Sequence, residues 1–376
     1  ILASLIVFVF LIPYTASLYN GLSRLFGMAF HLDYTVCIVV MAVLTGIYVI
    51  AGGYMATAIN DFIQGCIMII GIIAVIASVL KSNGGFMQAI DALARVEDAQ
   101  ATSTPGAFAS FFGPDPFGLL CVVILTSLGT WGLPQMVQKF YAIKDEKSIG
   151  KGTLISTIFA IIVAGGCYFL GGFGRLYDID IAAQGYDAII PAMIEKLSPF
   201  LIAVVVILVL SASMSTLSSL VLASSSTLTL DMIRGTIVKE MTEKKQVFIM
   251  RIFIVVFIAI SAVIAVVQYK SGVTFIAQLM GISWGALAGA FLAPFIYSLY
   301  WKGVTKAAVL VNFLFGSGIM VANMLARASF PTILQSPINC GAFAMLAGLL
   351  IVPVVSLITP KLSDEKKQAV FSCYEK

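Results

Sequence analysis

The sequence predicts an all-α polytopic membrane protein, and four observations support this fold class. Hydrophobic residues make up 60% of the chain, charged residues make up only 11%, and the mean hydropathy is +1.04. This composition lies outside the range of water-soluble domains and argues against a soluble enzyme. The apolar residues also form ten runs, each long enough to cross a bilayer as a helix. The runs occupy residues 1–26, 34–53, 57–80, 117–138, 152–173, 198–228, 247–269, 273–300, 304–326 and 339–360.

Lysine and arginine residues predict which ends of these runs face the cytoplasm. When all 22 are sorted onto alternate sides, 15 fall on one side and 7 on the other. Cytoplasmic connections carry the excess of positive charge, so we expect both ends of this stretch in the cytoplasm and the chain in the plasma (inner) membrane. Ile1 already lies within an apolar run, so we expect the numbering to begin inside a longer protein.

The connections between the runs carry few signs of chemistry. Residues 81–116 are expected to form an external loop with one short surface helix, and residues 361–376 a cytoplasmic tail. The charged loops are ordinary flanks of membrane helices and do not indicate nucleic-acid binding, and nothing in the sequence implies an oligomer. The six cysteines stand singly, and no catalytic Ser/His/Asp or Cys/His set occurs. We therefore do not expect an enzyme.

The most unusual stretch is residues 211–229, which carries eleven hydroxyl side chains in nineteen positions without a charge or a proline. Ala212, Ser215 and Thr216 stand at i, i+3 and i+4, so one carbonyl and two hydroxyls can share a helix face. Neutral oxygen ligands suit a hard monovalent cation that must bind and leave, and sodium is the natural candidate. The alternative is that these hydroxyls donate to carbonyls of their own helix or join neighbouring helices.

Asp61 is the carboxylate best placed to enter the membrane, because it opens the third apolar run. An ionisable group at such a depth costs a few kcal/mol and is a functional candidate by default. Alternatively, Asn60 and Asp61 cap a helix that begins there.

The fourth run contains Gly129, Gly132 and Pro134 close together. Proline frees a backbone carbonyl, and irregular backbone at membrane depth is tolerated where it lines a cavity. This pattern predicts a substrate pocket, although the proline could simply kink a packed helix. The candidate contacts are Ser127, Thr130, Trp131 and Gln135.

The eighth run has Gly281, Gly285 and Gly289 four residues apart, a spacing that lets two helices approach closely. We expect these glycines to serve packing. Gln278, Ser283 and Trp284, near the outer half of the run, are candidates to line a path or form a gate.

Four separated passages resemble the sodium/solute symporter family, which includes sodium/proline, pantothenate, sialic acid and sodium/glucose transporters. They are YVIAGGYMATAINDFIQG, GLPQMVQKFYAIKD, SASMSTLSS and WGALAGAFLAPFIYSLYWKGVT. The resemblance implies two inverted five-helix repeats with ions and substrate held at mid-membrane. Three helices, including the first two of repeat one, are then expected upstream of this chain. The implied division is 1–80 for the last three helices of repeat one, 117–300 for repeat two and 301–360 for two accessory helices.

The same resemblance implies roles for particular residues. Ala212, Ser215 and Thr216 match the family's sodium ligands, and Asp61 matches an acidic position linked to ion binding. Ser218 and Ser219 match a second sodium site that only some members have. Two departures matter: Asn60 replaces a hydroxyl residue, and Thr126 and Thr130 stand where sodium/proline symporters carry aromatic residues. The second departure argues against proline itself as the substrate.

These observations together predict a sodium-coupled symporter that imports a small organic solute, such as an amino acid, a monocarboxylate or a sugar, by alternating access. One alternative is a proton-coupled symporter that uses Asp61. The other is a channel or sensor derived from a transporter.

Overall fold

The computed structural model describes residues 1–98, 101–141, 143–177, 179–238, 240–272 and 276–374, and every regular element within these ranges is a helix. Nine helical stretches among the described residues are long and apolar enough to cross a membrane. A tenth is broken, because Pro116–Gly132 and Pro134–Phe140 meet at an angle of 50°. The prediction of many apolar spans is therefore confirmed, with nine such stretches and one broken pair among the described residues. The nine are Leu2–Phe30, Tyr34–Gly52, Ala58–Ser82, Glu146–Leu176, Pro199–Ile237, Glu243–Ser271, Ile276–Tyr300, Lys306–Leu325 and Pro337–Ile358.

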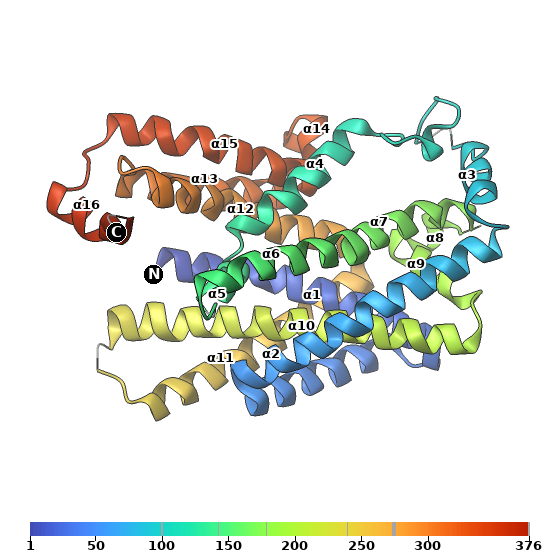
Figure 1. The fold of residues 1–376 in the computed structure, drawn as a ribbon, viewed down its shortest axis with the longest axis horizontal. Coiled ribbons are helices and arrows are strands. Elements are labelled where there is room, and N and C mark those ends of the chain that lie inside the picture. The colour runs from blue at the N-terminus through green and yellow to red at the C-terminus, as the bar shows by residue number, and fades with distance from the viewer. Residues whose placement is uncertain (99–100, 142, 178, 239, 273–275, 375–376) are drawn as a thin grey trace.

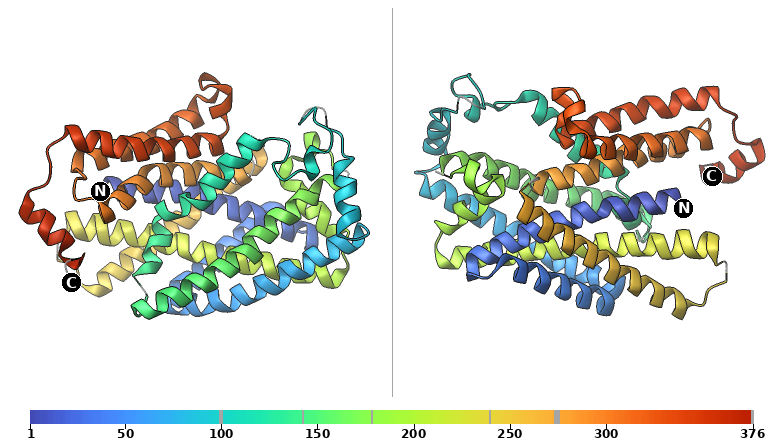
Figure 2. Two further views of the ribbon diagram at one scale, coloured as in Figure 1. Left: turned by 45° about the horizontal axis from the view of Figure 1, so that its top comes forward. Right: turned by 180° about the vertical axis from the view of Figure 1, so that it is seen from behind.

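The long helices lie side by side, and Figures 1 and 2 show both termini at the same end of the molecule. Their bounds are α1 (Leu2–Phe30), α2 (Tyr34–Ser82), α4 (Pro116–Ser127), α5 (Pro134–Phe140), α6 (Glu146–Phe159), α7 (Gly165–Gly172), α10 (Pro199–Ser226), α11 (Glu243–Ser271), α12 (Ile276–Tyr300), α13 (Lys306–Leu325) and α15 (Pro337–Ile358). The short helices are α3 (Phe86–Ala94), α8 (Ile181–Gln184), α9 (Ile189–Glu195), α14 (Thr332–Gln335) and α16 (Asp364–Phe371).

Two spans contain wider π-helical turns. Ala160–Ala164 joins α6 to α7, and Thr227–Ile237 prolongs α10 beyond the predicted end at residue 228. A 3-10 turn, η2 (Gly129–Gly132), follows α4. Pro134 then starts α5, since proline lacks the N–H that the first helical turn does not need. The predicted kink in the fourth run is therefore a break between two helices.

Two groups of helices share the core. α10, α11 and α2 pack together on one side of α1, while α12, α13 and α15 pack on the other, as Figures 1 and 2 show. α12 contacts both groups, because it packs against α1 as well as against α13 and α15. Its buried residues run almost without interruption from Leu279 to Pro294.

Glycines bring α12 into close contact with its neighbours. A Cβ added at Gly285 would lie 2.7 Å from the Cα of Gly341 on α15. A Cβ at Gly289 would lie 2.9 Å from the Cβ of Ala344, and one at Gly316 only 2.3 Å from the carbonyl carbon of Gly289. These distances are shorter than any real Cβ contact, so the predicted packing role of the glycines in this run is confirmed.

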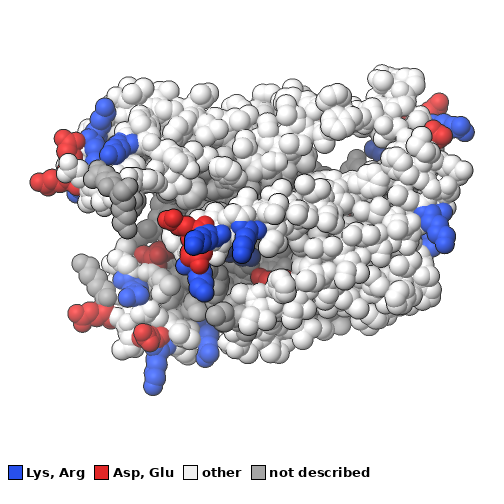
Figure 3. All heavy atoms as spheres, in the orientation of Figure 1, with Lys and Arg blue, Asp and Glu red and all other residues white. Residues whose placement is uncertain are grey.

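The outer surface suits a bilayer. Figure 3 shows, on the face drawn, charged side chains over the half that carries both termini, reaching the middle of the view, and at the opposite end, with an uncharged stretch between these two groups. Large apolar side chains such as Ile47, Ile70 and Leu350 are exposed on the outward sides of their helices. Exposed apolar side chains in this number fit lipid rather than water.

Candidate functional site

The hydroxyls of α10 donate to carbonyls of their own helix. Ser215 and Thr216 both donate to the carbonyl of Ala212, at 3.1 and 2.9 Å. Ser218 and Ser219 both donate to the carbonyl of Ser215, at 2.9 and 3.1 Å. This is the alternative arrangement that the sequence left open. It does not prevent cation binding, because each hydroxyl oxygen keeps its lone pairs for a ligand after donating its proton.

The carbonyl of Ala212 is more heavily used than the hydroxyls. It accepts hydrogen bonds from the hydroxyls of Ser215 and Thr216 in addition to the backbone hydrogen bond of the α-helix. A carbonyl oxygen has only two lone pairs, so these donors already exceed its capacity. A cation bound to this carbonyl would therefore break the hydrogen bond that at least one of the two hydroxyls donates to it. The three predicted ligands lie on one face, and using them together requires one of the two hydroxyls to turn.

A cavity of about 240 Å³ joins three of the predicted site residues. Asp61 reaches it from α2, Gln135 from α5 and Ser219 from α10. The complete lining is Ala58, Asp61, Gln135, Gln138, Lys139, Ser219 and Leu222. The structure thus places the carboxylate of Asp61 beside α10.

Asp61 is not a helix cap. It lies inside α2, which begins at Tyr34 and is capped by Asp33. Its neighbour Asn60 donates from its side-chain amide to the hydroxyl of Tyr48, at 2.9 Å. The interpretation of Asn60 and Asp61 as a cap is therefore wrong.

The polar groups around this cavity are incompletely paired. The Oδ2 atom of Asp61 lies 3.9 Å from the ammonium nitrogen of Lys139, while its buried Oδ1 atom has no hydrogen-bond partner among the described residues. Gln135 is only 3% exposed, and neither its amide nitrogen nor its amide oxygen has a partner in the described part of the chain. Buried polar atoms without partners are costly and uncommon. A ligand that satisfies them is the simplest reason for their presence.

Three of the predicted substrate contacts lie elsewhere. Ser127 is exposed, and its carbonyl accepts a hydrogen bond from the hydroxyl of Thr130 at 2.8 Å. Trp131 is 58% exposed and lines a second cavity of about 240 Å³ together with Pro134, Gln138 and Asp231. The break after Gly132 thus separates Gln135 from the other three predicted contacts in this run, which are Ser127, Thr130 and Trp131.

Gln278 and Ser283 lie on α12, outside the lining of the first cavity. Ser283 is fully buried, and its hydroxyl has no hydrogen-bond partner within the described ranges. Gln278 is half-buried, near the first turn of the helix. The structure therefore does not bring these two residues to the cavity that contains Gln135.

Sequence reasoning missed Gln138 and Lys139 as lining residues. They follow Gln135 at i+3 and i+4, so the spacing alone places all three on one face of α5. Asp231, which lines the second cavity, was also missed.

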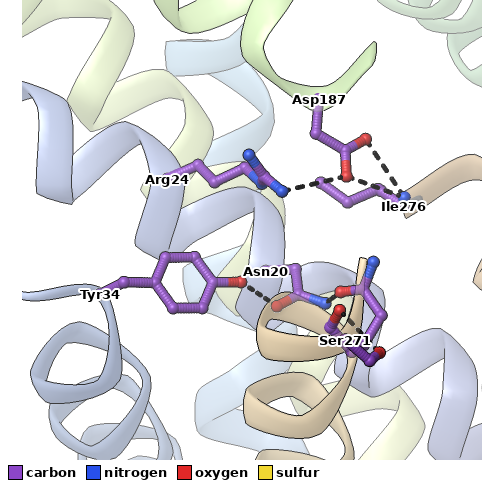
Figure 4. Close-up of polar contacts among 7 residues, drawn as sticks. Asn20, Arg24, Tyr34, Asp187, Ser271 and Ile276 are labelled. Carbon is purple, nitrogen blue, oxygen red and sulfur yellow. Dashed lines mark hydrogen bonds and ion pairs between the residues drawn. The ribbon is translucent and has the colours of Figure 1, made fainter. Parts of the chain in front are cut away.

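A second polar cluster lies near the opposite end of α1 (Figure 4). Arg24 lies 3.6 Å from the carboxylate of Asp187, which also accepts from the backbone N–H of Ile276 with both oxygens at 3.2 Å. Burial raises the pKa of the Asp187 carboxyl above its usual value, while the Ile276 amide and Arg24 act to lower that pKa. Asn20 links Tyr34 and Gln268 by accepting from the first and donating to the second. This cluster connects α1, α2, α11 and α12.

Comparisons with known proteins place these features in a family. A family model for the sodium:solute symporter family matches residues 1–316. The chain is 29% identical to sodium/proline symporter 2 of Staphylococcus saprophyticus over 85% of this chain and 61% of that protein. It is 26% identical to the osmoregulated proline transporter of Bacillus subtilis over 96% of this chain and 71% of that protein. The chain thus spans less than two thirds of the length of the first of these relatives, and both are transport proteins by name.

Among solved structures, the fold is similar to that of a Na+-coupled sialic acid symporter in a substrate-bound outward-open state. The TM-score is 0.67, at 17% sequence identity, over 96% of this chain and 75% of the other. This likeness confirms the all-helical polytopic fold. Because the family model covers most of the chain, this multi-pass membrane protein belongs to the sodium:solute symporter family.

Proposed function

We propose that the protein is a sodium-driven symporter that imports a small organic solute by alternating access. The observation that carries this proposal is the cavity shared by Asp61, Gln135 and Ser219. It combines an incompletely paired carboxylate, a hydroxyl oxygen and an unpaired buried amide, which are groups suited to a cation and to a polar solute. The names of the relatives, which mention sodium together with proline or sialic acid, support the same class.

We assign the sodium ligands in two sets. The first is Ala212, Ser215 and Thr216, and the second is Asp61, Ser218 and Ser219. The shared face supports the first set, because Ser215 and Thr216 both lie within 3.1 Å of the Ala212 carbonyl, and one of these hydroxyls would turn when a cation binds there. The shared cavity supports the second set, because it brings Asp61 and Ser219 together. Sodium is here a transported substrate that provides the driving force.

For the solute, Gln135 is the strongest contact on structural grounds, followed by Trp131 in the adjoining cavity. The two cavities share Gln138 as a lining residue. Ser127, Thr130, Gln278 and Ser283 stay as weaker candidates. Thr126 and Thr130, in place of aromatic residues, favour a solute other than proline.

The arrangement of repeats is part of the proposal. Residues 1–80 and 117–300 would form the inverted repeats, and 301–360 the accessory helices. The close packing of α12 with both α13 and α15 supports attachment of the accessory helices to the last helix of the second repeat.

The test is uptake into proteoliposomes with and without an inward sodium gradient, after a thermal-shift screen of small amino acids, monocarboxylates and sugars has identified a solute. Accumulation against a solute gradient that stops when sodium is replaced by choline would support the proposal. Uptake at an undiminished rate without sodium would refute it.

Two other outcomes would point to the alternatives. Accumulation driven by a proton gradient alone would favour a proton-coupled symporter that uses Asp61. Flux that never exceeds equilibrium would favour a channel or a sensor.

A further inference from the structure

Lys139 is a cation that the chain itself supplies to the candidate ion site. It lies in the last turn of α5, where the helix dipole favours a positive charge, and its ammonium group is 3.9 Å from Asp61. Gln135, Gln138 and Lys139 all line the cavity from the same face of this short helix. The lysine therefore reaches the carboxylate from the segment that also carries the buried glutamine.

The ion pair is loose by its geometry. A distance of 3.9 Å is within ion-pair contact but exceeds the 2.7–3.2 Å of a hydrogen bond. The Lys139 side chain is 50% exposed and that of Asp61 23%, so the ammonium group can turn into water on its flexible stem. The second carboxylate oxygen, Oδ1, is buried without a partner among the described residues. Lys139 thus compensates the charge of Asp61 without saturating its oxygens.

Two cations cannot share this carboxylate at low cost. A cation held by Asp61 and Ser219 would occupy the same small cavity that the Lys139 side chain lines. At separations of a few ångströms, repulsion between like charges is substantial even near a protein surface. An arriving cation must therefore either accept that repulsion or displace the ammonium group.

We propose that Lys139 is the internal counter-ion of Asp61 and competes with the transported cation for it. In the empty site the ammonium group balances the carboxylate, and on cation binding it moves to water. Because Lys139 and Gln135 belong to the same seven-residue helix, release of the lysine frees the segment that carries the solute contact. This inference rests on the proposed function, since it assumes that sodium binds at Asp61. The competing interpretation is that Lys139 is only a solvated charge at the end of a membrane helix.

The test is equilibrium binding of radioactive sodium to the purified full chain in lipid nanodiscs. For Lys139→Met, we expect the sodium concentration at half-saturation to fall roughly fivefold, which corresponds to about 1 kcal/mol. Lys139→Arg keeps the charge and should bind sodium like the wild type. Lys144→Met removes a nearby charge outside the cavity and serves as the matched control.

A double-mutant cycle separates charge competition from an indirect effect. In the Asp61→Asn background, Lys139→Met should no longer change sodium affinity, because the contested carboxylate is absent. If Lys139→Met folds poorly, Lys139→Gln replaces it, and the quantity of monodisperse protein is measured for every variant.

The outcomes distinguish the two proposals. A wild-type chain that binds no sodium overturns both the sodium-driven function and the competition. Sodium binding that is unchanged or weaker in Lys139→Met and Lys139→Gln overturns the competition alone. An equal gain in Lys139→Arg would also overturn it, since the charge would then not be the cause.

Discussion

Asp187 accepts a hydrogen bond from the backbone amide of Ile276, the first residue of α12, with both carboxylate oxygens 3.2 Å from the nitrogen. A carboxylate at this position stabilises the helix start through the orphan N–H groups and the helix dipole. The guanidinium group of Arg24 on α1 forms an ion pair with the same carboxylate, with 3.6 Å between its nitrogen and the Oδ2 atom of Asp187. One residue of the connection between α7 and α10 therefore ties together the starting end of α12 and the final third of α1.

The first prediction concerns the pH dependence of stability that Asp187 causes. Burial raises the pKa of Asp187 above 3.8, so between about pH 4 and the raised value the folded protein holds a proton that the unfolded chain has lost. The contribution of this group to stability thus decreases as the pH rises through that window. Asp187→Asn should show a weaker fall of the melting temperature across the window than the wild type. Asp91→Asn, an exposed change on α3, is the control, and equal slopes for Asp187→Asn and wild type would contradict the prediction.

The second prediction concerns the hydroxyls of α10. Ser215→Ala and Thr216→Ala each remove one proposed ligand and one hydrogen bond within the helix. We expect each to lower the apparent sodium affinity roughly tenfold, the effect of losing one polar contact to a charge, with little loss of protein. Ser225→Ala is matched to them, since this buried serine of the same helix also donates within the helix, to Val221. Unchanged sodium dependence in well-expressed variants would show that the hydroxyls are structural.

The third prediction concerns the charge of Asp61. Asp61→Asn removes the charge, whereas Asp61→Glu keeps it one methylene further from the backbone. Sodium activation should therefore be weakened more by the asparagine than by the glutamate. The measurement is the sodium dependence of solute uptake, normalised to the quantity of protein in the membrane. The reverse order would show that side-chain length matters more than charge.

The fourth prediction compares two buried glutamines. Gln135 has no hydrogen-bond partner for its amide among the described residues, whereas Gln268 accepts from Asn20. Gln135→Met should leave the melting temperature of the empty protein unchanged or raise it, because an unsatisfied polar group is removed. Gln268→Met should lower it by leaving Asn20 without that acceptor. The Gln135 variant should, however, lose the stabilisation that the solute gives. Retained stabilisation by the solute would remove Gln135 from the binding site.

The fifth prediction concerns the packing of α12. Gly285→Ala would place a Cβ 2.7 Å from the Cα of Gly341, so two helices must separate. We expect a destabilisation of about 1–3 kcal/mol, the usual range for overpacking. Gly318→Ala, on α13, meets no atom within 4 Å and should be neutral or slightly stabilising. Thermal unfolding in detergent followed by fluorescence measures both, and similar effects for the two variants would contradict the packing argument.

The sequence predicted the fold well because its signals are local. Apolar length defined the spans, and the four-residue spacing of Gly281, Gly285 and Gly289 defined the packed face of α12. The family resemblance linked Asp61 to ion binding, and the structure shows that Asp61 and Ser219 line the same cavity. The pair of Asp61 with Lys139 was not foreseen, because it joins two helices whose relative placement depends on the whole bundle.

The substrate contacts were predicted less well, for a related reason. Ser127, Thr130, Trp131 and Gln135 stand within nine positions, so on one continuous helix they would be neighbours. The 50° break between Pro116–Gly132 and Pro134–Phe140 directs Gln135 into a different cavity from Trp131. The size of this change in direction depends on how the segment packs against other helices.

The same break has a mechanical consequence. A Cβ at Gly132 would lie 2.9 Å from the backbone nitrogen of Leu292, so the chain just before the bend is held tightly against α12. Any rotation of α5 relative to the bundle would therefore have its pivot at this bend, and α5 extends about 10 Å beyond it, at 1.5 Å of rise per residue. A rotation of about 10° at the pivot would move the Lys139 end by about 2 Å, a distance comparable to the diameter of a sodium ion. A small change in the angle between η2 and α5 would thus be large enough to open or close an ion-sized space beside Asp61.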